Sequence, residues 1–351
     1  MNIAGDIIGR LAETRHLTPR EYAVLLSPSL DPKAAAHLTA AARERTDGIF
    51  GRKVRIRGLI EVTNVCRNNC LYCGLRRDNR DLPRYTLSTG TILDSCRRGY
   101  EAGFRTFVLQ GGENPALTVE RVTETVRRIY TTYPDAAITL SLGEWPDEAY
   151  AAFRQAGASR YLLRHETHNR CHYSQLHPSD MSLDNRLRCL DTLKRLGYQT
   201  GTGIMVGSPG QTTAHIIEDL EYMHHLQPEM IGIGPFLPNS STPFGCCQPG
   251  NLELTVRLIS ILRLMFPNAN IPSTTALATL DSEGRNRGIM AGANVVMPNL
   301  TPPECRAAYS LYDNKASTGA EAAEGIALLR EQLARIGMEI TTEKGDYNNY
   351  V

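Results

Sequence analysis

The sequence predicts an α/β protein built as a closed (β/α)8 TIM barrel with a helical extension in front of it. From residue 56 almost to the end of the chain, apolar runs of strand length alternate with stretches of helix length. This alternation is typical of a parallel sheet with crossover helices. Polar residues directly follow each expected strand, at the edge of a barrel that carries its chemistry.

Eight expected strands favour a closed barrel, and an open doubly wound sheet is the alternative. Several of the helical stretches end at a glycine, which is common punctuation before a strand. The strands are expected at residues 56–62, 106–110, 137–142, 161–164, 201–206, 230–235, 270–273 and 294–297, and the helices at 93–102, 119–130, 147–156, 182–196, 213–226, 252–265 and 320–336.

Residues 1–50 are expected to form the helical extension, and residues 51–351 the barrel with its C-terminal helix. Thr18, Pro19 and Glu21 supply an N-cap, a proline in the first helical position and an acidic first turn. Asp31 and Pro32 begin a second helix in the same way. No internal repeat or long linker interrupts the pattern, so we predict one barrel domain that carries this extension.

The composition excludes several classes of protein. Of 351 residues, 42% are hydrophobic and 21% charged, as in ordinary globular domains. The formal net charge is +1, from 38 basic and 37 acidic residues, so no overall field favours nucleic acid or an anionic membrane. No window approaches the ~18 apolar residues of a spanning helix, and a secretory signal is not expected. Nine cysteines, three of them clustered, predict a reduced, cytoplasmic protein.

Cys66, Cys70 and Cys73 follow the first expected strand in a C-x3-C-x2-C spacing. Four cysteines are the usual full complement of a 4Fe–4S cluster, so three ligands leave one iron open. Metal sites with a vacant position are the reactive ones. A zinc knuckle favours C-x2-C pairs with a second pair downstream, and the sequence has no such pair. The spacing therefore predicts a 4Fe–4S cluster with one open iron.

The same loop, with Tyr72 before the third cysteine, resembles the signature of the radical S-adenosylmethionine (SAM) superfamily. In that family the open iron binds the amino and carboxylate groups of SAM, and one electron releases a 5′-deoxyadenosyl radical. Direct ligation holds the cosubstrate in the geometry that electron transfer needs. The resemblance implies an enzyme that uses SAM. A metallocluster scaffold or electron-transfer protein that does not cleave SAM is the alternative from another class.

The resemblance also assigns residues to SAM. Gly111 and Gly112 would let the backbone approach the methionine part, and Glu113 would accept a hydrogen bond from its ammonium. Glu166 matches a ribose-binding acid, and Arg186 a basic partner of the SAM carboxylate. As alternatives, the Gly-Gly-Glu run is an ordinary turn, Glu166 forms a salt bridge at the barrel rim, and Arg186 lies on a helix surface. The remaining expected SAM contacts are Tyr72, Ser141 and Met205.

Longer runs resemble one branch of the superfamily, the HydE family of FeFe-hydrogenase maturases, over roughly residues 50–315. Methylornithine synthase and biotin synthase share the general layout but match RYLLRHET and the two threonines at 274 and 275 less well. The runs are CGLRRDN (73–79), LSLGEWP (140–146), RYLLRHET (160–167), IGIGPF (231–236) and IPSTTA (271–276).

This resemblance implies a polar patch opposite SAM that contains Arg164, Thr274, Thr275, Tyr309 and Tyr312. An arginine fork suits a carboxylate or a metal-bound anion. The implied substrate is an organometallic iron–CO–CN–cysteine precursor of the hydrogenase H-cluster. The alternative is a mutase like methylornithine synthase that acts on an amino acid. The two tyrosines stand three residues apart on an expected helix, so packing residues are their alternative interpretation.

The resemblance further implies a reductant such as ferredoxin or flavodoxin and other hydrogenase maturases as partners, without nucleic acid or membrane. Some relatives carry a second cluster on three cysteines near the C-terminus, but residues 313–327 contain no cysteine here. We therefore expect a single 4Fe–4S cluster. Cys96 and Cys189 fall in helical patterns as small buried side chains, and the adjacent Cys246 and Cys247 have no assigned role.

Overall fold

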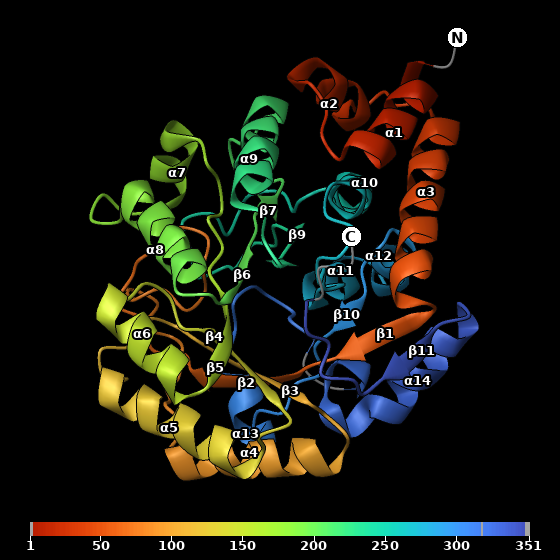
Figure 1. Ribbon diagram of the computed structural model, residues 1–351. Coiled ribbons are helices and arrows are strands. Elements are labelled where there is room, and N and C mark those ends of the chain that lie inside the picture. Colours follow the sequence, from red (N-terminus) through yellow and green to blue (C-terminus); the bar gives the residue numbers. More distant parts are fainter. Residues whose placement is uncertain (1–2, 317–318, 348–351) are drawn as a thin grey trace.

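The structure is a computed structural model that describes residues 3–316 and 319–347. Its parallel strands lie inside a ring of helices (Figure 1). The strands are β1 Lys53–Ile56, β2 Gly58–Thr63, β3 Thr106–Gly111, β4 Ala137–Ser141, β5 Ala158–Leu162, β6 Gln199–Thr202, β7 Met205–Val206, β8 Met230–Ile231, β9 Gly234–Pro235, β10 Val295–Val296 and β11 Glu339–Thr341.

The helices fall into an N-terminal group of three, α1 to α3, and those that follow the strands. Their bounds are α1 Ile3–Thr14, α2 Pro19–Leu26, α3 Pro32–Phe50, α4 Thr89–Glu101, α5 Val119–Thr132, α6 Asp147–Ala156, α7 Arg170–Leu176, α8 Leu183–Arg195, α9 Thr213–Leu226, α10 Leu252–Met265, α11 Thr275–Leu280, α12 Gly284–Met290, α13 Pro303–Arg306 and α14 Ile326–Arg335.

The strands form three parallel sheets rather than the single eight-stranded sheet that was expected. Six strands follow the order β2-β3-β4-β5-β6-β8, three the order β10-β1-β11, and β7 pairs with β9. Isolated parallel bridges lie between these sheets and join Leu59 to Asn299, Met230 to Asn270 and Pro272 to Val295. The prediction of an α/β fold with a parallel sheet and crossover helices is confirmed.

Two predicted strands, 201–206 and 230–235, are each broken in the middle. The backbones of Gly203 and Gly232 approach so closely there that a Cβ atom on Gly203 would overlap the carbonyl oxygen of Gly232. The predicted strand at 270–273 is wrong, because this segment carries only the isolated bridges at Asn270 and Pro272. Proline lacks the N–H group that a continuous ladder requires.

Helix boundaries follow the sequence closely where caps are local. The predicted ranges 147–156, 213–226 and 252–265 coincide with α6, α9 and α10. The last helix, expected from residue 320, begins at Ile326 instead, after two short 3-10 turns. Gly319 and Gly325 pack so closely there that a Cβ atom on Gly325 would overlap the carbonyl oxygen of Gly319.

The N-terminal helices α1, α2 and α3 pack against α9 and α10 on the outside of the strands, as the upper part of Figure 1 shows. Leu11 of α1, Leu25 of α2 and Leu38 of α3 are buried in one hydrophobic cluster with Leu220 and Leu258. Thr18 forms the predicted N-cap, completed by a capping box with Glu21. The extension therefore shares its core with the helices that follow it.

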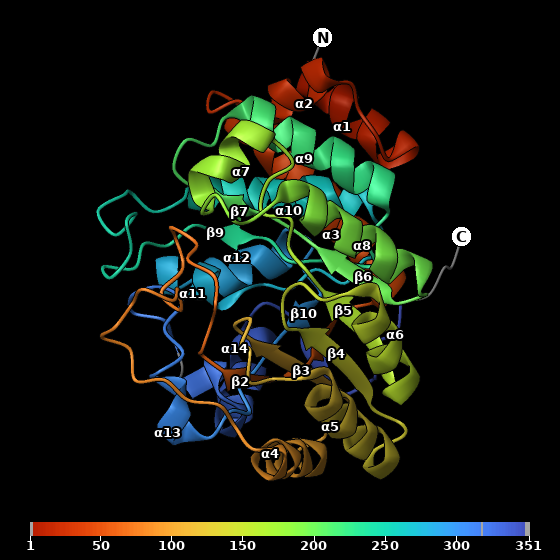
Figure 2. The same ribbon diagram turned by 90° about the vertical axis from the view of Figure 1, so that its left-hand side faces the viewer.

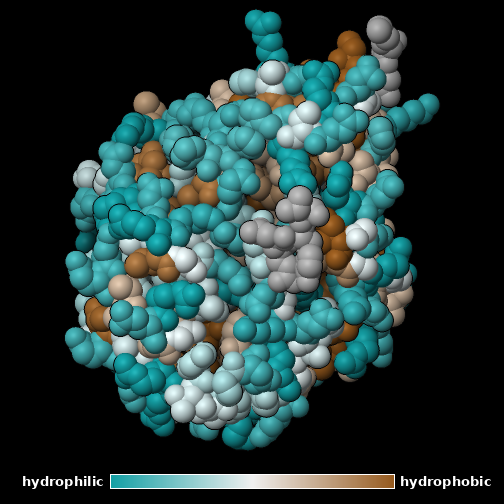
Figure 3. Space-filling view, in the orientation of Figure 1, coloured by the Kyte–Doolittle hydropathy of each residue, from teal (hydrophilic) through white to brown (hydrophobic). Residues whose placement is uncertain are grey.

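The loops that follow the strands lie together on the left of Figure 2, opposite the C-terminus. On the C-terminal side, the fully buried Arg160 of β5 donates to Asp346 Oδ1 and to the Lys344 carbonyl, both at 2.9 Å. The face drawn in Figure 3 is mostly hydrophilic with scattered apolar patches. Within residues 3–316 and 319–347, no helix combines the length and apolar character needed to cross a bilayer.

Candidate active site

The cysteine loop that follows β2 is held in shape by Arg84. Its guanidinium donates to four backbone carbonyls, those of Asn64, Leu75, Arg76 and Asn79, at 2.6 to 2.9 Å. Sequence reasoning missed Arg84 because it stands in a run of mixed charges that gives no periodic signal. These four bonds brace the loop.

All three loop cysteines are half-buried free thiols. Burial raises the pKa of Cys66, and it raises the pKa of Cys73 to about 12. Burial and the charges of the other two thiolates raise the pKa of Cys70 well above its ordinary value. Positively charged iron would favour the thiolates, which are the ligands of iron–sulfur clusters. Three thiols on one loop fit a cluster that is held by three cysteines. A site for a single metal ion, built from three or more His, Cys, Asp or Glu side chains, is not found among the described residues.

The Gly-Gly-Glu run begins at Gly111, the last residue of β3, and packs against β2 and the cysteine loop. A Cβ atom on Gly112 would lie 2.7 Å from Cys66 Cβ, and one on Gly111 would lie 2.9 Å from Thr63 Cγ2. The glycines thus allow two loops to approach. Glu113 accepts from the Arg67 guanidinium at 3.0 Å and from the Glu144 N–H at 3.2 Å. Its predicted role toward SAM, and those of both glycines, stay predictions.

Glu166 is in the left-handed region of backbone space, with φ +65°. A residue other than glycine pays roughly 1–3 kcal/mol for such a conformation, and such strain clusters at functional sites. The Glu166 N–H donates to the Gly203 carbonyl at 3.0 Å. The Glu166 side chain is buried, and its Oε2 lies 3.0 Å from Arg164 Nη2. This pair is the rim salt bridge that the sequence offered as an alternative to ribose binding.

Arg186 is buried and already has a carboxylate partner. Its Nε donates to Glu144 Oε1 at 2.6 Å, and its Nη1 to the Arg164 carbonyl at 2.9 Å. Burial lowers the pKa of Arg186, but the Glu144 carboxylate together with Tyr173, Glu113 and Tyr72 outweighs that effect, so the pKa is raised overall. The helix-surface interpretation of Arg186 is therefore wrong, because the side chain points inward from α8. Its contact with SAM stays a prediction.

Three further predicted SAM contacts lie on or beside the strand ends. Tyr72 packs with Met205 and Phe236 in a small apolar cluster. Ser141 ends β4 and stands in register with Gln110 of β3. Burial, and after it the charges of Glu166 and Cys70, raises the pKa of Tyr72 well above its ordinary value.

Arg164 and Thr274 have buried polar atoms without partners. Arg164 Nε and Nη2 form no hydrogen bond within the described part of the chain, although Nη2 lies near Glu166, and Thr274 Oγ1 likewise has none. Both side chains lie over the glycines of the β8–β9 segment, Arg164 near Gly232 and Thr274 near Gly234. This wall therefore offers two donor groups to a ligand.

Thr275 and the two tyrosines are placed differently. Thr275 Oγ1 donates to Glu321 Oε2 at 2.8 Å, so its hydroxyl already has a partner. Tyr309 and Tyr312 are not on a helix, because α13 ends at Arg306 and both follow it in a loop. The prediction of a helix there is wrong. The loop reaches the cysteine loop, where the Gly74 N–H donates to the Leu311 carbonyl at 2.9 Å.

Tyr309 belongs to a buried polar network that the sequence did not reveal. Its hydroxyl accepts from Gln110 Nε2 at 3.2 Å, and Lys315 Nζ lies 4.8 Å from its ring centre. Lys315 also pairs with Glu61, a fully buried residue of β2. Glu61 lies 2.9 Å from Asn299 Nδ2. Residues 61 and 315 are far apart in sequence, so no local pattern could pair them.

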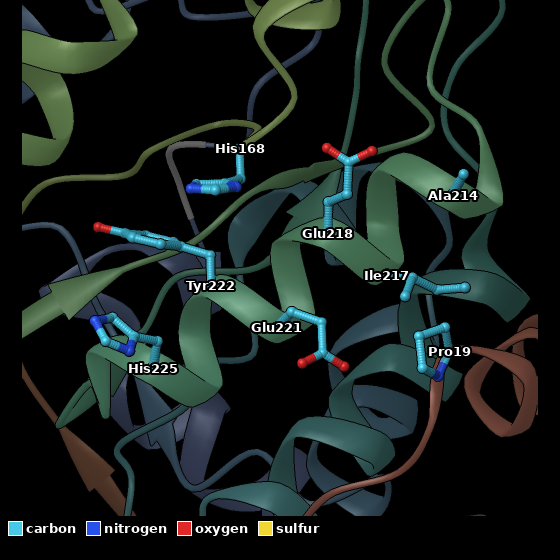
Figure 4. A pocket seen from close by; sticks show the side chains of 8 residues that line it. All are labelled: Pro19, His168, Ala214, Ile217, Glu218, Glu221, Tyr222 and His225. Carbon is cyan, nitrogen blue, oxygen red and sulfur yellow. The ribbon is translucent and has the colours of Figure 1, made fainter.

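A separate pocket lies on the outer side of α9 (Figure 4). None of the predicted site residues lines it. The lining residues are Pro19, His168, Ala214, Ile217, Glu218, Glu221, Tyr222 and His225.

Comparison with known proteins identifies relatives along most of the chain. Residues 60–223 match the model of the radical SAM superfamily. The [FeFe] hydrogenase maturase subunit HydE of Thermotoga maritima is 46% identical over 76% of this chain and 75% of its own. The 3-methylornithine synthase of Methanosarcina barkeri is 31% identical over 88% of this chain and 87% of its own. The crystal structure of methylornithine synthase (PylB) is similar with a TM-score of 0.83 and 27% identity, over 95% of this chain and 97% of that one.

Proposed function

The chain belongs to the radical SAM superfamily, and from that premise we propose that it is a HydE-type maturase. Its substrate would be an organometallic iron–CO–CN–cysteine precursor of the FeFe-hydrogenase H-cluster. The observation that carries the proposal is the 46% identity with the HydE subunit. The 31% identity with a methylornithine synthase is lower, which supports the maturase over the mutase.

Superfamily membership implies a 4Fe–4S cluster and SAM. When bound, they supply an electron and a 5′-deoxyadenosyl radical. Cys66, Cys70 and Cys73 would hold the one cluster that we expect, because they are free thiols on a loop that Arg84 braces. Glu113, whose carboxylate pairs with Arg67 of this loop, would bind the cationic group of SAM, and Glu166 would bind its hydroxyl groups.

We infer that the three sheets together enclose a chamber. The isolated bridges between Leu59 and Asn299, Met230 and Asn270, and Pro272 and Val295 support a barrel whose strands meet all the way round. A closed wall excludes water from a reactive radical and prevents side reactions.

The substrate side of the chamber would bind an anionic ligand in preference to a neutral one. Among the described residues, Arg164 Nε and Thr274 Oγ1 are buried without a hydrogen-bond partner, and Arg164 Nη2 lies 3.0 Å from Glu166 Oε2 in an ion pair. Buried polar groups cost free energy unless a partner satisfies them. A carboxylate or a metal-bound anion would satisfy the Arg164 fork. We further propose that a ferredoxin or flavodoxin reduces the cluster and that the protein works with other hydrogenase maturases.

The Arg164→Ala variant tests the chamber assignment. It removes the substrate-side cation and leaves the three cysteines in place. Because it also frees Glu166 from its ion pair, SAM cleavage without substrate is measured at saturating SAM, where it should persist. We expect maturation of hydrogenase to fall at least about tenfold, the effect of roughly 1.4 kcal/mol or more of lost binding. Product would be measured as hydrogenase activity after maturation, and 5′-deoxyadenosine by chromatography.

The matched control is Arg97→Ala. Arg97 is an exposed arginine of α4 that pairs only with Glu101 of the same helix among the described residues, so both readouts should equal those of the wild type. Maturation at full rate by Arg164→Ala would refute the chamber assignment.

The second candidate function is an amino-acid mutase like methylornithine synthase. The similarity to the PylB structure over almost the whole of both chains supports it. The two candidates differ in substrate: the mutase would turn over lysine, and the maturase the iron–cysteine precursor.

A further inference from the structure

His177 stands directly behind the aromatic residue of the cysteine loop. The Tyr72 hydroxyl lies 3.2 Å from His177 Nε2. The neighbouring backbone is joined as well, because the Leu71 N–H donates to the Leu176 carbonyl at 2.9 Å. The end of α7 and the cysteine loop are therefore tied together at this point.

The hydrogen bonds of His177 determine which of its ring nitrogens carries the proton. His177 Nδ1 lies 3.0 Å from the Tyr173 carbonyl oxygen, which can only accept. Nδ1 is therefore the donor, and in the neutral ring Nε2 is the acceptor for the Tyr72 hydroxyl. Burial, with the charge of Arg186, lowers the pKa of His177 to about 3, which is consistent with a neutral ring.

Aromatic contacts hold the same imidazole in place. Tyr173 stacks on His177 with ring centres 4.0 Å apart, and Tyr72 meets the ring edge-on at 5.5 Å. Tyr72 also packs against the apolar cluster of Leu176, Met205 and Phe236. His177 is itself only 3% exposed, so its ring has little freedom to turn.

We propose that His177 is a positioning residue, which fixes the Tyr72 ring in the orientation that receives SAM. The inference rests on the proposed function, since it needs SAM to bind against the cysteine loop. This relay of hydrogen bonds runs from the Tyr173 carbonyl of α7, through the His177 imidazole, to the Tyr72 hydroxyl. Without the acceptor nitrogen, the hydroxyl must either stay unsatisfied or turn the ring away from the site.

The test is a double-mutant cycle on SAM affinity. His177→Leu removes the acceptor, and the dissociation constant for SAM should rise about tenfold, which corresponds to one lost buried hydrogen bond. His177→Gln is the conservative variant, because its amide can donate to the Tyr173 carbonyl and accept from Tyr72. It should stay within about twofold of the wild type.

Tyr72→Phe removes the hydroxyl that needs the acceptor. In this background, His177→Leu should change the affinity by less than about twofold. Affinity is measured by anaerobic titration calorimetry on the reconstituted protein, with the iron content determined for each variant. The KM for SAM in uncoupled cleavage should rise in His177→Leu, while kcat at saturating SAM should not change.

Two results would overturn the inference. One is wild-type affinity in His177→Leu, and the other is an equal loss of affinity whether His177→Leu is made in the wild type or in the Tyr72→Phe variant. If His177→Leu fails to hold its iron, the comparison of His177→Gln with the wild type decides, since a weakened affinity there contradicts the relay. A wild-type protein that binds no SAM would instead refute the proposed function.

Discussion

Cys70 is the middle cysteine of the loop, and its Sγ lies 3.7 Å from Met181 Sδ. Cys70→Ala leaves two thiolates, too few for the predicted cluster. We expect the brown chromophore and the formation of 5′-deoxyadenosine both to disappear. Absorption spectra, iron content and product chromatography after anaerobic reconstitution check this.

Cys246→Ala is the control for that variant, because Cys246 is an exposed free thiol outside the loop. It should retain the chromophore and the SAM cleavage of the wild type. A cluster that survives in Cys70→Ala would contradict the ligand assignment.

A functional side chain can be predicted from the sequence only when the pattern that marks it lies within a short stretch of the chain. Cys66, Cys70 and Cys73 fall within eight residues, so their spacing is visible without a structure. Arg84, His177 and Lys315 act through backbone carbonyls or partners from distant segments, which leaves no trace in a single sequence. The resemblance already assigned Arg186 to the site, but its pairing with Glu144 was hidden for the same reason.

The second helix tests the local rules at the scale of one element. The Glu21 N–H donates to Thr18 Oγ1 at 3.4 Å, and the Thr18 N–H donates to Glu21 Oε2 at 2.9 Å. Thr18→Ala removes the cap, and the free energy of unfolding should fall by about 1 kcal/mol. Urea denaturation followed by circular dichroism measures the change.

Thr18→Ser keeps the hydroxyl and should lose no more than a few tenths of that amount. Equal losses in Thr18→Ser and Thr18→Ala would show that the hydroxyl is not what stabilises the helix.

Elements are predictable to the residue where local signals mark their ends, such as Gly157 after α6 and the N-caps Thr212 of α9 and Asn251 of α10. The breaks at Gly203 and Gly232 are not, because each depends on the close approach of the other strand. The same holds for the segment at 270–273. It lies where a strand was expected, but it is joined to Met230 and Val295 only by isolated bridges.

At the scale of the whole molecule, one of the two large hydrophobic clusters crosses the expected boundary at residue 50. Leu11 of α1 is fully buried in the cluster that includes α9 and α10. Leu11→Ala should lower the free energy of unfolding by about 2–5 kcal/mol. Because the core is shared, we propose that extension and barrel unfold in one transition, which denaturation followed by fluorescence and by circular dichroism would reveal as coincident curves.

Ile3→Ala is the matched control on the same helix, since Ile3 is 66% exposed. Its effect should stay within about 0.5 kcal/mol. Two separate transitions in the wild type would show that the extension is an independent unit.

The central claim is that this radical SAM enzyme acts on an organometallic precursor. The most direct measurement is 5′-deoxyadenosine formation by the anaerobically reconstituted protein with SAM and dithionite, in the presence of either the iron–CO–CN–cysteine precursor or lysine. We predict that the precursor accelerates the reaction and is consumed, and that lysine does neither. Conversion of lysine, or an intact cluster that yields no 5′-deoxyadenosine, would contradict the account.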